Sequence, residues 1–263
     1  MNDFVAMLAQ RVDDAARNAQ AIAQFGEGAR LTTSDAYAIQ AASIARRIER
    51  GERRSGVKMG FTSRAKMVQM GVHDMIWGRL TDAMALEEGA AVSLSRYVHA
   101  RVEPELAFLL SKPLPPRVSL AEALEAVAAI APALEVIDSR YENFKFSLTD
   151  VIADNASSSG YVIGPWADPR RDFSNLGLVL SIDGRPRQIG STAGILGHPL
   201  RSLVAAARLA GDAGEPLQAG WIVMAGGATA AEALGPGMHV RCEMQGLGSV
   251  ELTTDESGDD ACR

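Results

Sequence analysis

The sequence predicts an α+β fold in which a helical N-terminal part precedes a strand-rich core. Two segments in the first 50 residues carry helical spacing or capping residues, and the second half consists largely of short strand-like runs separated by turns. The 263 residues, 47% hydrophobic and 22% charged, can bury a sizeable core. We expect a helical part at residues 1–55, a β-rich domain at 56–254 and a disordered polar tail at 255–263.

The N-terminal part is predicted to contain two helices. The first covers residues 2 to 25, where apolar residues recur at helical spacing. The second begins after the capping residues Thr32–Asp35 and ends at Gly51. A strand at 56–62 follows and carries Lys58 among apolar and glycine residues. Lys58 is either a proton carrier with a lowered pKa beside a cleft, or a lysine whose stem covers apolar surface while its ammonium reaches water.

The rest of the chain continues this alternation of helices and strands. We expect a short helix ending at Gly71, a connector at 77–84, a strand at 91–95 and a helix at 120–130 that begins after Ser119. Asp183-Gly184 predicts a hairpin, because this dipeptide favours tight turns between strands. Further elements predicted in the second half are a helix at 200–209 and strands at 221–224, 239–244 and 249–253.

Three glutamates are the main chemical feature of the sequence. Side chains alternate along an extended segment, so Glu103 and Glu105 share one face of their strand. Glu135 lies in a short apolar run that reads as another strand, where an ionised carboxylate is costly unless a cation or hydrogen bonds compensate it. Together they would form an all-oxygen site for Mg²⁺ or Mn²⁺. The alternative is that Glu103 and Glu105 line the solvated face of an edge strand and Glu135 lies at a strand end.

Two segments of small residues are candidates for ligand contacts. Residues 154–160 combine an acid, an amide and three serines, so they either present polar groups to an anionic ligand or form a simple turn. Gly226-Gly227 allows close approach of the backbone to a ligand, or a tight turn.

Several classes of protein are excluded or disfavoured by composition. A net charge of −6 without a clustered basic face argues against nucleic-acid binding. Two cysteines and four histidines without metal-ligand spacing argue against a Cys/His metal site. Motifs for nucleotide binding and for serine hydrolases are absent from the sequence. No apolar run is long enough for a membrane span and no signal peptide is recognisable, so we expect a cytoplasmic protein.

Seven short motifs occur in order over nearly the whole chain. They are Asp35–Gln40, Lys58–Ser63, Val102–Phe108, Glu135–Arg140, Ala153–Ser158, Leu196–Pro199 and Gly246–Val250. Together they resemble the 2-keto-4-pentenoate hydratase and 4-oxalocrotonate decarboxylase family, within the fumarylacetoacetate hydrolase superfamily. Residues 65–71 and 141–146 resemble the decarboxylase branch. Pro236-Gly237-Met238 departs from the family, which usually has an aspartate after this glycine.

The resemblance implies a fold and a set of site residues. The implied fold is a mixed, barrel-like β-sheet core of the fumarylacetoacetate hydrolase type with an N-terminal helical subdomain. The implied metal is Mg²⁺ or Mn²⁺, held by Glu103, Glu105 and Glu135 beside an active-site lysine that matches Lys58. Candidates for binding the substrate carboxylates are Asp154, Asn155, Ser157, Ser158, Gly227 and Thr229.

The resemblance also implies an activity and partners. The decarboxylase branch acts on 2-oxohex-3-enedioate, a keto diacid, and yields 2-hydroxypenta-2,4-dienoate and CO₂ during meta-cleavage of aromatic compounds. We also expect a homo-oligomer and a complex with the pathway hydratase. The nearest rival activity is that of the hydratase itself, acting on 2-hydroxypenta-2,4-dienoate with the same metal site. A non-catalytic scaffold for the hydratase, a C–C hydrolase and an oxaloacetate decarboxylase are less favoured by these residues.

Overall fold

The computed structural model describes residues 3–26, 30–63, 67–68 and 74–256. Its helices are α1 (Asp3–Arg17), α2 (Thr33–Glu49), α4 (Leu120–Glu125), α5 (Leu148–Ala153) and α6 (Pro199–Asp212). Its strands are β1 (Arg54–Gly60), β2 (Ile76–Thr81), β3 (Ala85–Leu86), β4 (Ala91–Val92), β5 (Arg101–Leu110), β6 (Val127–Ile137), β7 (Ser158–Ile163), β8 (Gly177–Ile182), β9 (Arg185–Ser191), β10 (Ile222–Met224), β11 (Glu232–Ala233), β12 (His239–Met244) and β13 (Gly248–Thr254). The end at Gly71 of the short predicted helix and residues 257–263 of the predicted tail lie outside the described residues.

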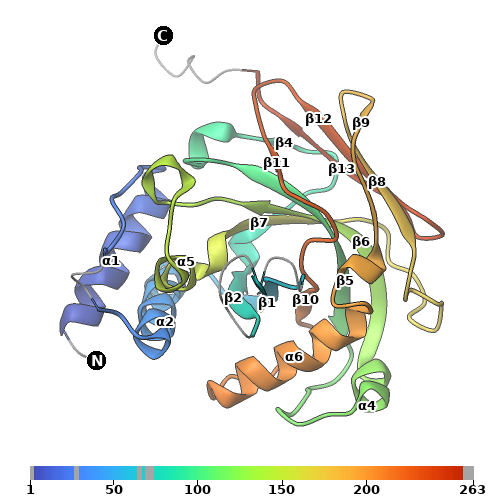
Figure 1. Ribbon diagram of the computed structural model, residues 1–263, viewed down its shortest axis with the longest axis horizontal. Coiled ribbons are helices and arrows are strands. Elements are labelled where there is room, and N and C mark those ends of the chain that lie inside the picture. Colours follow the sequence, from blue (N-terminus) through green and yellow to red (C-terminus); the bar gives the residue numbers. More distant parts are fainter. Residues whose placement is uncertain (1–2, 27–29, 64–66, 69–73, 257–263) are drawn as a thin grey trace.

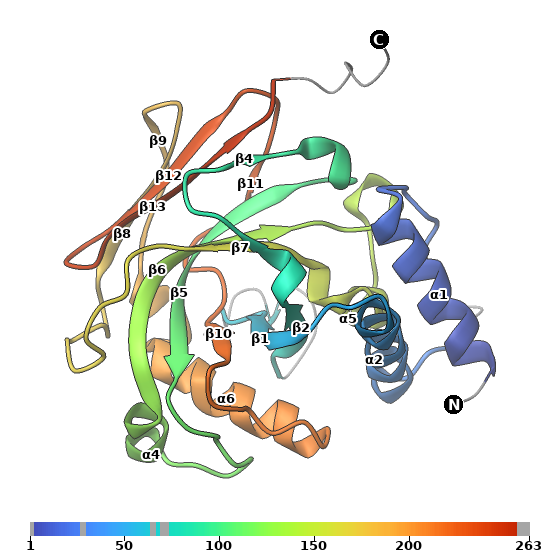
Figure 2. The same cartoon turned by 180° about the vertical axis from the view of Figure 1, so that it is seen from behind.

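The described strands form two sheets. The larger sheet has the order β2-β1-β10-β5-β6-β7-β3, with β11 also paired to β5, and it mixes parallel and antiparallel pairs. Figures 1 and 2 show this sheet curling partly around a centre, with α6 on one side and α1 and α2 on another. The smaller sheet has the order β4-β13-β12-β8-β9 and contacts β6 through β12 and β13. The predicted mixed, barrel-like core with N-terminal helices is therefore confirmed.

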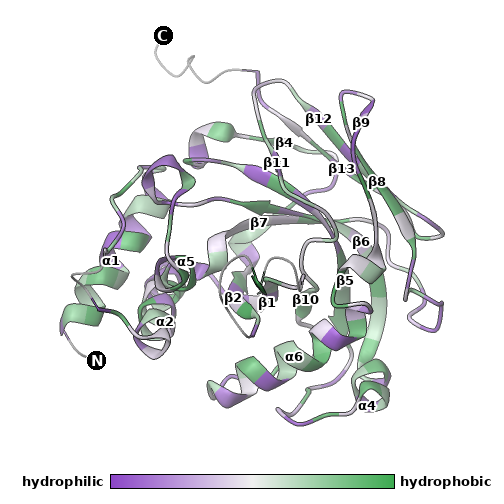
Figure 3. Ribbon diagram, in the orientation of Figure 1, coloured by the Kyte–Doolittle hydropathy of each residue, from purple (hydrophilic) through white to green (hydrophobic). Residues whose placement is uncertain are grey.

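The antiparallel β5–β6 ladder is the centre of the larger sheet. It runs from the Arg101–Ile137 pair to the Leu110–Val127 pair. One face of β5 carries Val102, Leu106 and Phe108, which join the main hydrophobic core with residues of the smaller sheet. The hydrophobic colouring along much of β6 in Figure 3 reflects the same core. The other face of β5 carries Glu103 and Glu105 into the curled sheet, so the predicted alternation is confirmed and the edge-strand alternative is wrong.

The two N-terminal helices pack on one another and on α5. Helix α2 begins as predicted, because Thr32 and Asp35 form a capping box in which each side chain accepts a hydrogen bond from the other's backbone N–H. Helix α1 ends at Arg17, earlier than predicted. No helix within the described ranges is both long and apolar enough to cross a membrane. The division of the chain at residues 55 and 254 stays a prediction.

Two predicted elements were wrong, and the strand predicted at 91–95 ends at Val92. Residues 77–84 do not form a connector: most of them belong to β2, whose residues are all buried beside β1. The helix predicted at 120–130 ends at Glu125, and β6 begins at Val127. Val127 and Ile130 are buried in the core and pair with β5, so long-range strand pairing overrides the helical spacing of the apolar residues. The hairpin at Asp183-Gly184 is confirmed, with both residues in the left-handed region.

A buried carboxylate connects α1 to α2. Asp13 is 2% exposed and accepts hydrogen bonds from Arg46 Nε at 2.7 Å and from Arg50 Nη1 and Nη2 at 2.7 and 2.6 Å. Burial raises the pKa of Asp13, but the hydrogen bonds and charges of Arg50 and Arg46 outweigh it and hold the pKa below its ordinary value of 3.8. The ionised form of Asp13 therefore stabilises the folded protein.

We predict that Asp13→Asn lowers the free energy of unfolding at pH 7 by about 2 kcal/mol, because charge-assisted hydrogen bonds are lost. The difference from wild type should persist above pH 3.8 and shrink as the pH falls through the lowered pKa of the folded state. Urea denaturation across this pH range measures it. The matched control is Asp14→Asn, since Asp14 is 44% exposed in its side chain and has one 3.4 Å contact with Arg46. A control effect as large as that of Asp13→Asn would contradict the prediction.

Candidate metal centre

Three glutamate side chains meet on the inner face of the β5–β6 ladder. Glu103 and Glu105 project from β5, and Glu135 projects from β6 directly opposite Glu103. Their exposed fractions are 8%, 0% and 0%. One carboxylate oxygen from each lies within 4.8 Å of the other two. The structure therefore brings together the three acids that the sequence predicted as metal ligands.

Few hydrogen bonds from the described residues compensate the negative charge of these carboxylates. Glu105 Oε2 accepts a hydrogen bond from the backbone N–H of Gly226 at 2.7 Å, while Glu105 Oε1 and Glu135 Oε1 are buried without a hydrogen-bond partner among the described residues. Burial, and then the charge of Glu135, raise the pKa of Glu105 well above its ordinary value. A divalent cation would satisfy these oxygens and relieve the repulsion. An all-carboxylate donor set suits a hard ion such as Mg²⁺ or Mn²⁺.

Lys58 supplies one positive charge beside this cluster. Its side chain on β1 is 4% exposed, and Nζ lies 3.0 Å from Glu135 Oε2 and donates a hydrogen bond to the carbonyl of Ala156 at 2.9 Å. Burial lowers the pKa of Lys58, but the charges of Glu135, Glu105 and Glu103 outweigh it and raise the pKa above its ordinary value. Both predicted alternatives for Lys58 are therefore wrong in part: its ammonium does not reach water, and its pKa is not lowered.

The acceptor of Lys58 lies in a conformationally unusual turn. Asn155, Ala156 and Ser157 all have positive φ, at 51°, 52° and 61°. Three successive non-glycine residues in the left-handed region carry backbone strain that surrounding contacts must hold. The Asn155 side chain accepts from the N–H of Arg79 at 2.7 Å and donates to its carbonyl at 2.9 Å. These bonds anchor the turn to β2 and orient the Ala156 carbonyl toward Lys58.

The predicted substrate-binding residues at 154–158 have different positions. Burial raises the pKa of Glu135 above its ordinary value, and the Ser158 hydroxyl lies close enough to this carboxyl to offset a small part of the rise, so Ser158 belongs to the site. Asp154 is fully buried and bonds to the guanidinium of Arg140, and Asn155 bonds to Arg79. The Ser157 carbonyl accepts a hydrogen bond from the Asp138 N–H. The carboxylate of Asp154 and the amide of Asn155 are thus engaged by the protein itself.

Close backbone approach explains the two adjacent glycines. A Cβ on Gly227 would lie 2.8 Å from Glu103 Oε2, and Gly226 has a φ of 103° and faces Thr62. Any side chain at Gly227 would therefore displace a carboxylate of the cluster. Thr229 lies apart from the acids in its contacts: its Cγ2 packs against Gly190 of β9, and its hydroxyl donates to the Ala230 carbonyl at 3.1 Å.

Two groups of the site were missed by sequence reasoning. The Gly226 N–H bonds to Glu105, and the Ala156 carbonyl bonds to Lys58. Both belong to the backbone, so the residue type at each position carries no direct signal of the role. The only indirect signal was that both lie in segments of small residues, which permit close approach of the main chain.

Known proteins are similar to this chain over most of its length. The family described as Fumarylacetoacetate (FAA) hydrolase C-terminal matches residues 50–254. A 4-oxalocrotonate decarboxylase from a Pseudomonas species is 58% identical over 95% of this chain and 98% of its own length. A 2-keto-4-pentenoate hydratase from Paraburkholderia xenovorans is 37% identical over 84% of this chain and 83% of its own length.

A solved structure gives the same result for the fold. The 4-oxalocrotonate decarboxylase from Pseudomonas putida G7, complexed with magnesium and adipate, superposes with a TM-score of 0.94 at 37% identity, covering 97% of this chain and 98% of that chain. The matches extend over the helices and both sheets rather than the strand-rich core alone. This chain belongs to the fumarylacetoacetate hydrolase family.

Proposed function

We propose that this protein is a Mg²⁺- or Mn²⁺-dependent decarboxylase that converts 2-oxohex-3-enedioate into 2-hydroxypenta-2,4-dienoate and CO₂. The observation that carries the proposal is the buried cluster of Glu103, Glu105 and Glu135 with the Lys58 ammonium 3.0 Å away. It is supported by 58% identity to a 4-oxalocrotonate decarboxylase. It is also supported by a similar decarboxylase structure that contains magnesium and adipate, a six-carbon diacid.

Decarboxylation leaves an electron pair on the substrate, and the site must stabilise the resulting negative charge. When the distal carboxylate leaves as CO₂, the electrons of the broken C–C bond move through the double bond to the 2-keto oxygen, which takes a proton and becomes the 2-hydroxyl of the product. A divalent cation supplies Lewis-acid stabilisation of negative charge on such an oxygen when it is bound. We assign Glu103, Glu105 and Glu135 to hold that cation, because two of these carboxylates have buried oxygens without other partners.

Lys58 is proposed as the proton donor for the developing hydroxyl. The charges of Glu135, Glu105 and Glu103 raise the pKa of Lys58 in the protein without a bound metal, and the Ala156 carbonyl and Glu135 hold Nζ in one position. The same positive charge favours the anionic substrate electrostatically. We propose the Ser158 hydroxyl and the backbone at Gly227 as substrate contacts, whereas Asp154 and Asn155 are proposed to hold the turn behind Lys58.

The proposed partners follow from the same reaction. The substrate is a small keto diacid, and the product is the compound that a 2-hydroxypenta-2,4-dienoate hydratase consumes. We propose a cytoplasmic homo-oligomer that associates with this hydratase, because passing an unstable dienol directly between the two enzymes would limit its loss to side reactions.

We expect metal-dependent CO₂ release from 2-oxohex-3-enedioate. The measurement is loss of ultraviolet absorbance of the substrate with coupled detection of CO₂, in Mg²⁺ and then in excess EDTA. EDTA should abolish turnover and added Mg²⁺ should restore it, because the carboxylate cluster alone cannot stabilise a further negative charge. Consumption of 2-hydroxypenta-2,4-dienoate without CO₂ release from the diacid would instead establish the hydratase activity.

The metal assignment predicts that Glu105→Gln weakens Mg²⁺ binding more than about tenfold, because one anionic ligand is lost. Isothermal titration calorimetry on EDTA-treated protein measures the affinity, and circular dichroism confirms that the fold is intact. The matched control is Glu125→Gln, since the side chain of Glu125 is 72% exposed on α4. Equal affinity in the Glu105→Gln variant and in wild type would disprove the assignment.

The role of Lys58 predicts a different pattern. Lys58→Met should lower kcat/KM at least about 100-fold through loss of the proton donor. Mg²⁺ affinity should not fall, because the substitution removes a cation that repels the metal at close range. Steady-state kinetics and calorimetry measure the two quantities, and Lys112→Met on the surface, at 54% side-chain exposure, is the control. Turnover near the wild-type level would rule out this role.

A further inference from the structure

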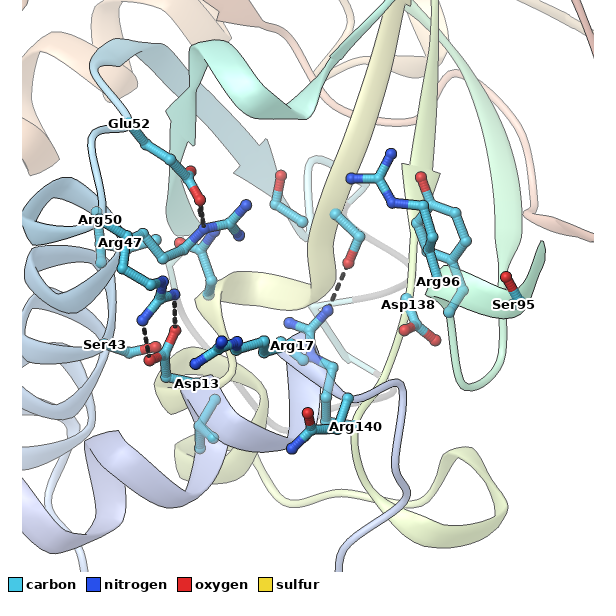
Figure 4. Close-up of a pocket in the computed structure, with 18 residues that line it drawn as sticks. Asp13, Arg17, Ser43, Arg47, Arg50, Glu52, Ser95, Arg96, Asp138 and Arg140 are labelled. Atoms are coloured by element: carbon cyan, nitrogen blue, oxygen red, sulfur yellow. Dashed lines mark hydrogen bonds and ion pairs between the residues drawn. The ribbon is translucent and has the colours of Figure 1, made fainter. Parts of the chain in front are cut away.

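A second polar cavity lies next to the turn that holds Lys58. Its volume is about 370 Å³, and it is lined by the C-terminal halves of α1 and α2, by residues 95–97 of the η3 turn (Leu94–Arg96) and its flank, and by residues near the start of β7. Figure 4 shows these side chains converging on one space. The three glutamates of the metal centre are not among its lining residues. The cavity therefore excludes the three carboxylates of the metal centre, although Ser158, which lies beside Glu135, is part of its wall.

Guanidinium groups dominate this cavity. Five arginines and three acids line it: Arg17, Arg47, Arg50, Arg96, Arg140, Asp13, Glu52 and Asp138. Arg47 pairs with Glu52 at 2.9 Å and Arg50 pairs with Asp13 at 2.6 Å. Arg140 pairs with Asp154, which lies behind the wall.

Two cations remain without a partner. Arg17 and Arg96 have no ion pair or side-chain hydrogen bond within residues 3–26, 30–63, 67–68 and 74–256, whereas every other arginine of the cavity has a carboxylate partner. The remaining acid, Asp138, already accepts hydrogen bonds from the N–H groups of Val98 at 2.9 Å and His99 at 2.5 Å. The cavity thus holds an excess of positive charge with its one remaining carboxylate engaged.

Some guanidinium N–H groups of the paired arginines also have no acceptor among the described residues. Arg47 bonds to Glu52 through Nε alone, so its Nη groups have no acceptor in the described structure. Arg140 directs three N–H groups to Asp154 and Ser159, which leaves two of its five donors. Such donors match the oxygens of carboxylate or phosphate groups, which guanidinium binds in a bidentate manner.

Helix dipoles do not account for this arrangement. Arg17 lies in the last turn of α1, where a cation is favoured without any ligand. Arg96, however, lies in a short 3-10 turn, and Arg140 lies in the loop after β6 with 4% exposure. Their convergence with Arg17 comes from tertiary packing of three separate parts of the chain, and it brings more guanidinium groups than lining carboxylates to one cavity.

We propose that this cavity binds a small oxyanion with two negative charges, a phosphate monoester or a dicarboxylate, at a site separate from the metal centre. Its volume is within the range of small-ligand sites. Arg17 and Arg96 supply the uncompensated charge, and Arg47 and Arg140 supply additional N–H donors. Binding requires neither the metal nor the proposed reaction, so it can be tested apart from both.

The test uses the full-length protein after EDTA treatment, so that no anion binds through a metal. Isothermal titration calorimetry with inorganic phosphate and, separately, with succinate shows whether the cavity binds a phosphate group or a dicarboxylate. We expect saturable binding of at least one probe, and a loss of affinity of at least about tenfold in the Arg17→Gln, Arg96→Gln double variant. The matched control is Arg185→Gln, Arg187→Gln, because these arginines are exposed on β9, far along the chain from the cavity.

Both cavity arginines are exposed at the rim, so the double variant should fold, which thermal unfolding verifies. No saturable binding of either probe would overturn the proposal, as would an equal loss of affinity in the β9 control. Sedimentation of the same samples tests whether the cavity is instead a contact between copies of the chain. If Arg17→Gln, Arg96→Gln converts a self-associated wild type into a smaller species, the cavity is a contact between copies of the chain and the proposal is wrong.

Discussion

The repulsion among three buried carboxylates is the constraint on which the rest of this structure depends. Glu105 and Glu135 are fully buried, and among the described residues the one ammonium beside them is that of Lys58. Burying several like charges is tolerated only when cations and hydrogen bonds compensate them. The central position of β5 and β6 in the larger sheet gives these side chains a rigid base. A divalent ion then supplies what the protein's own groups do not.

Backbone geometry around the cluster serves the same constraint. Gly227 approaches Glu103 where a Cβ would collide with its carboxylate, and the left-handed turn at 155–157 brings the Ala156 carbonyl to Lys58. Strain of this kind persists only when neighbouring bonds hold it. Here Asn155 is tied to Arg79, and Asp154 is tied to Arg140. The carboxylate of Asp154 and the amide of Asn155 therefore stabilise this turn, although residue type alone predicted that they contact a ligand.

The sequence predicted the parts of the site that depend on side-chain type and local periodicity. Alternation along β5 sufficed for Glu103 and Glu105, and an acid in an apolar run marked Glu135. Groups supplied by the main chain, such as the Ala156 carbonyl, could not be predicted because every residue has them. The direction of the pKa of Lys58 also depends on long-range packing, since its three neighbouring carboxylates come from distant strands. The uniformly buried β2 was missed for a related reason: a strand with both faces covered shows no alternation.

The charge state of Lys58 bears on which reaction this site favours. Addition of water to a diene needs a group that accepts a proton from water, and an ammonium cannot do so. Loss of CO₂ needs no attacking water and ends with a proton delivered to oxygen, which an ammonium can supply. In the protein without a bound metal, the charges of Glu135, Glu105 and Glu103 raise the pKa of Lys58, and the ammonium form that this favours suits decarboxylation. A cation held by the same carboxylates shifts this pKa in the opposite direction, so the preference for decarboxylation depends on Lys58 keeping its proton when the metal is bound.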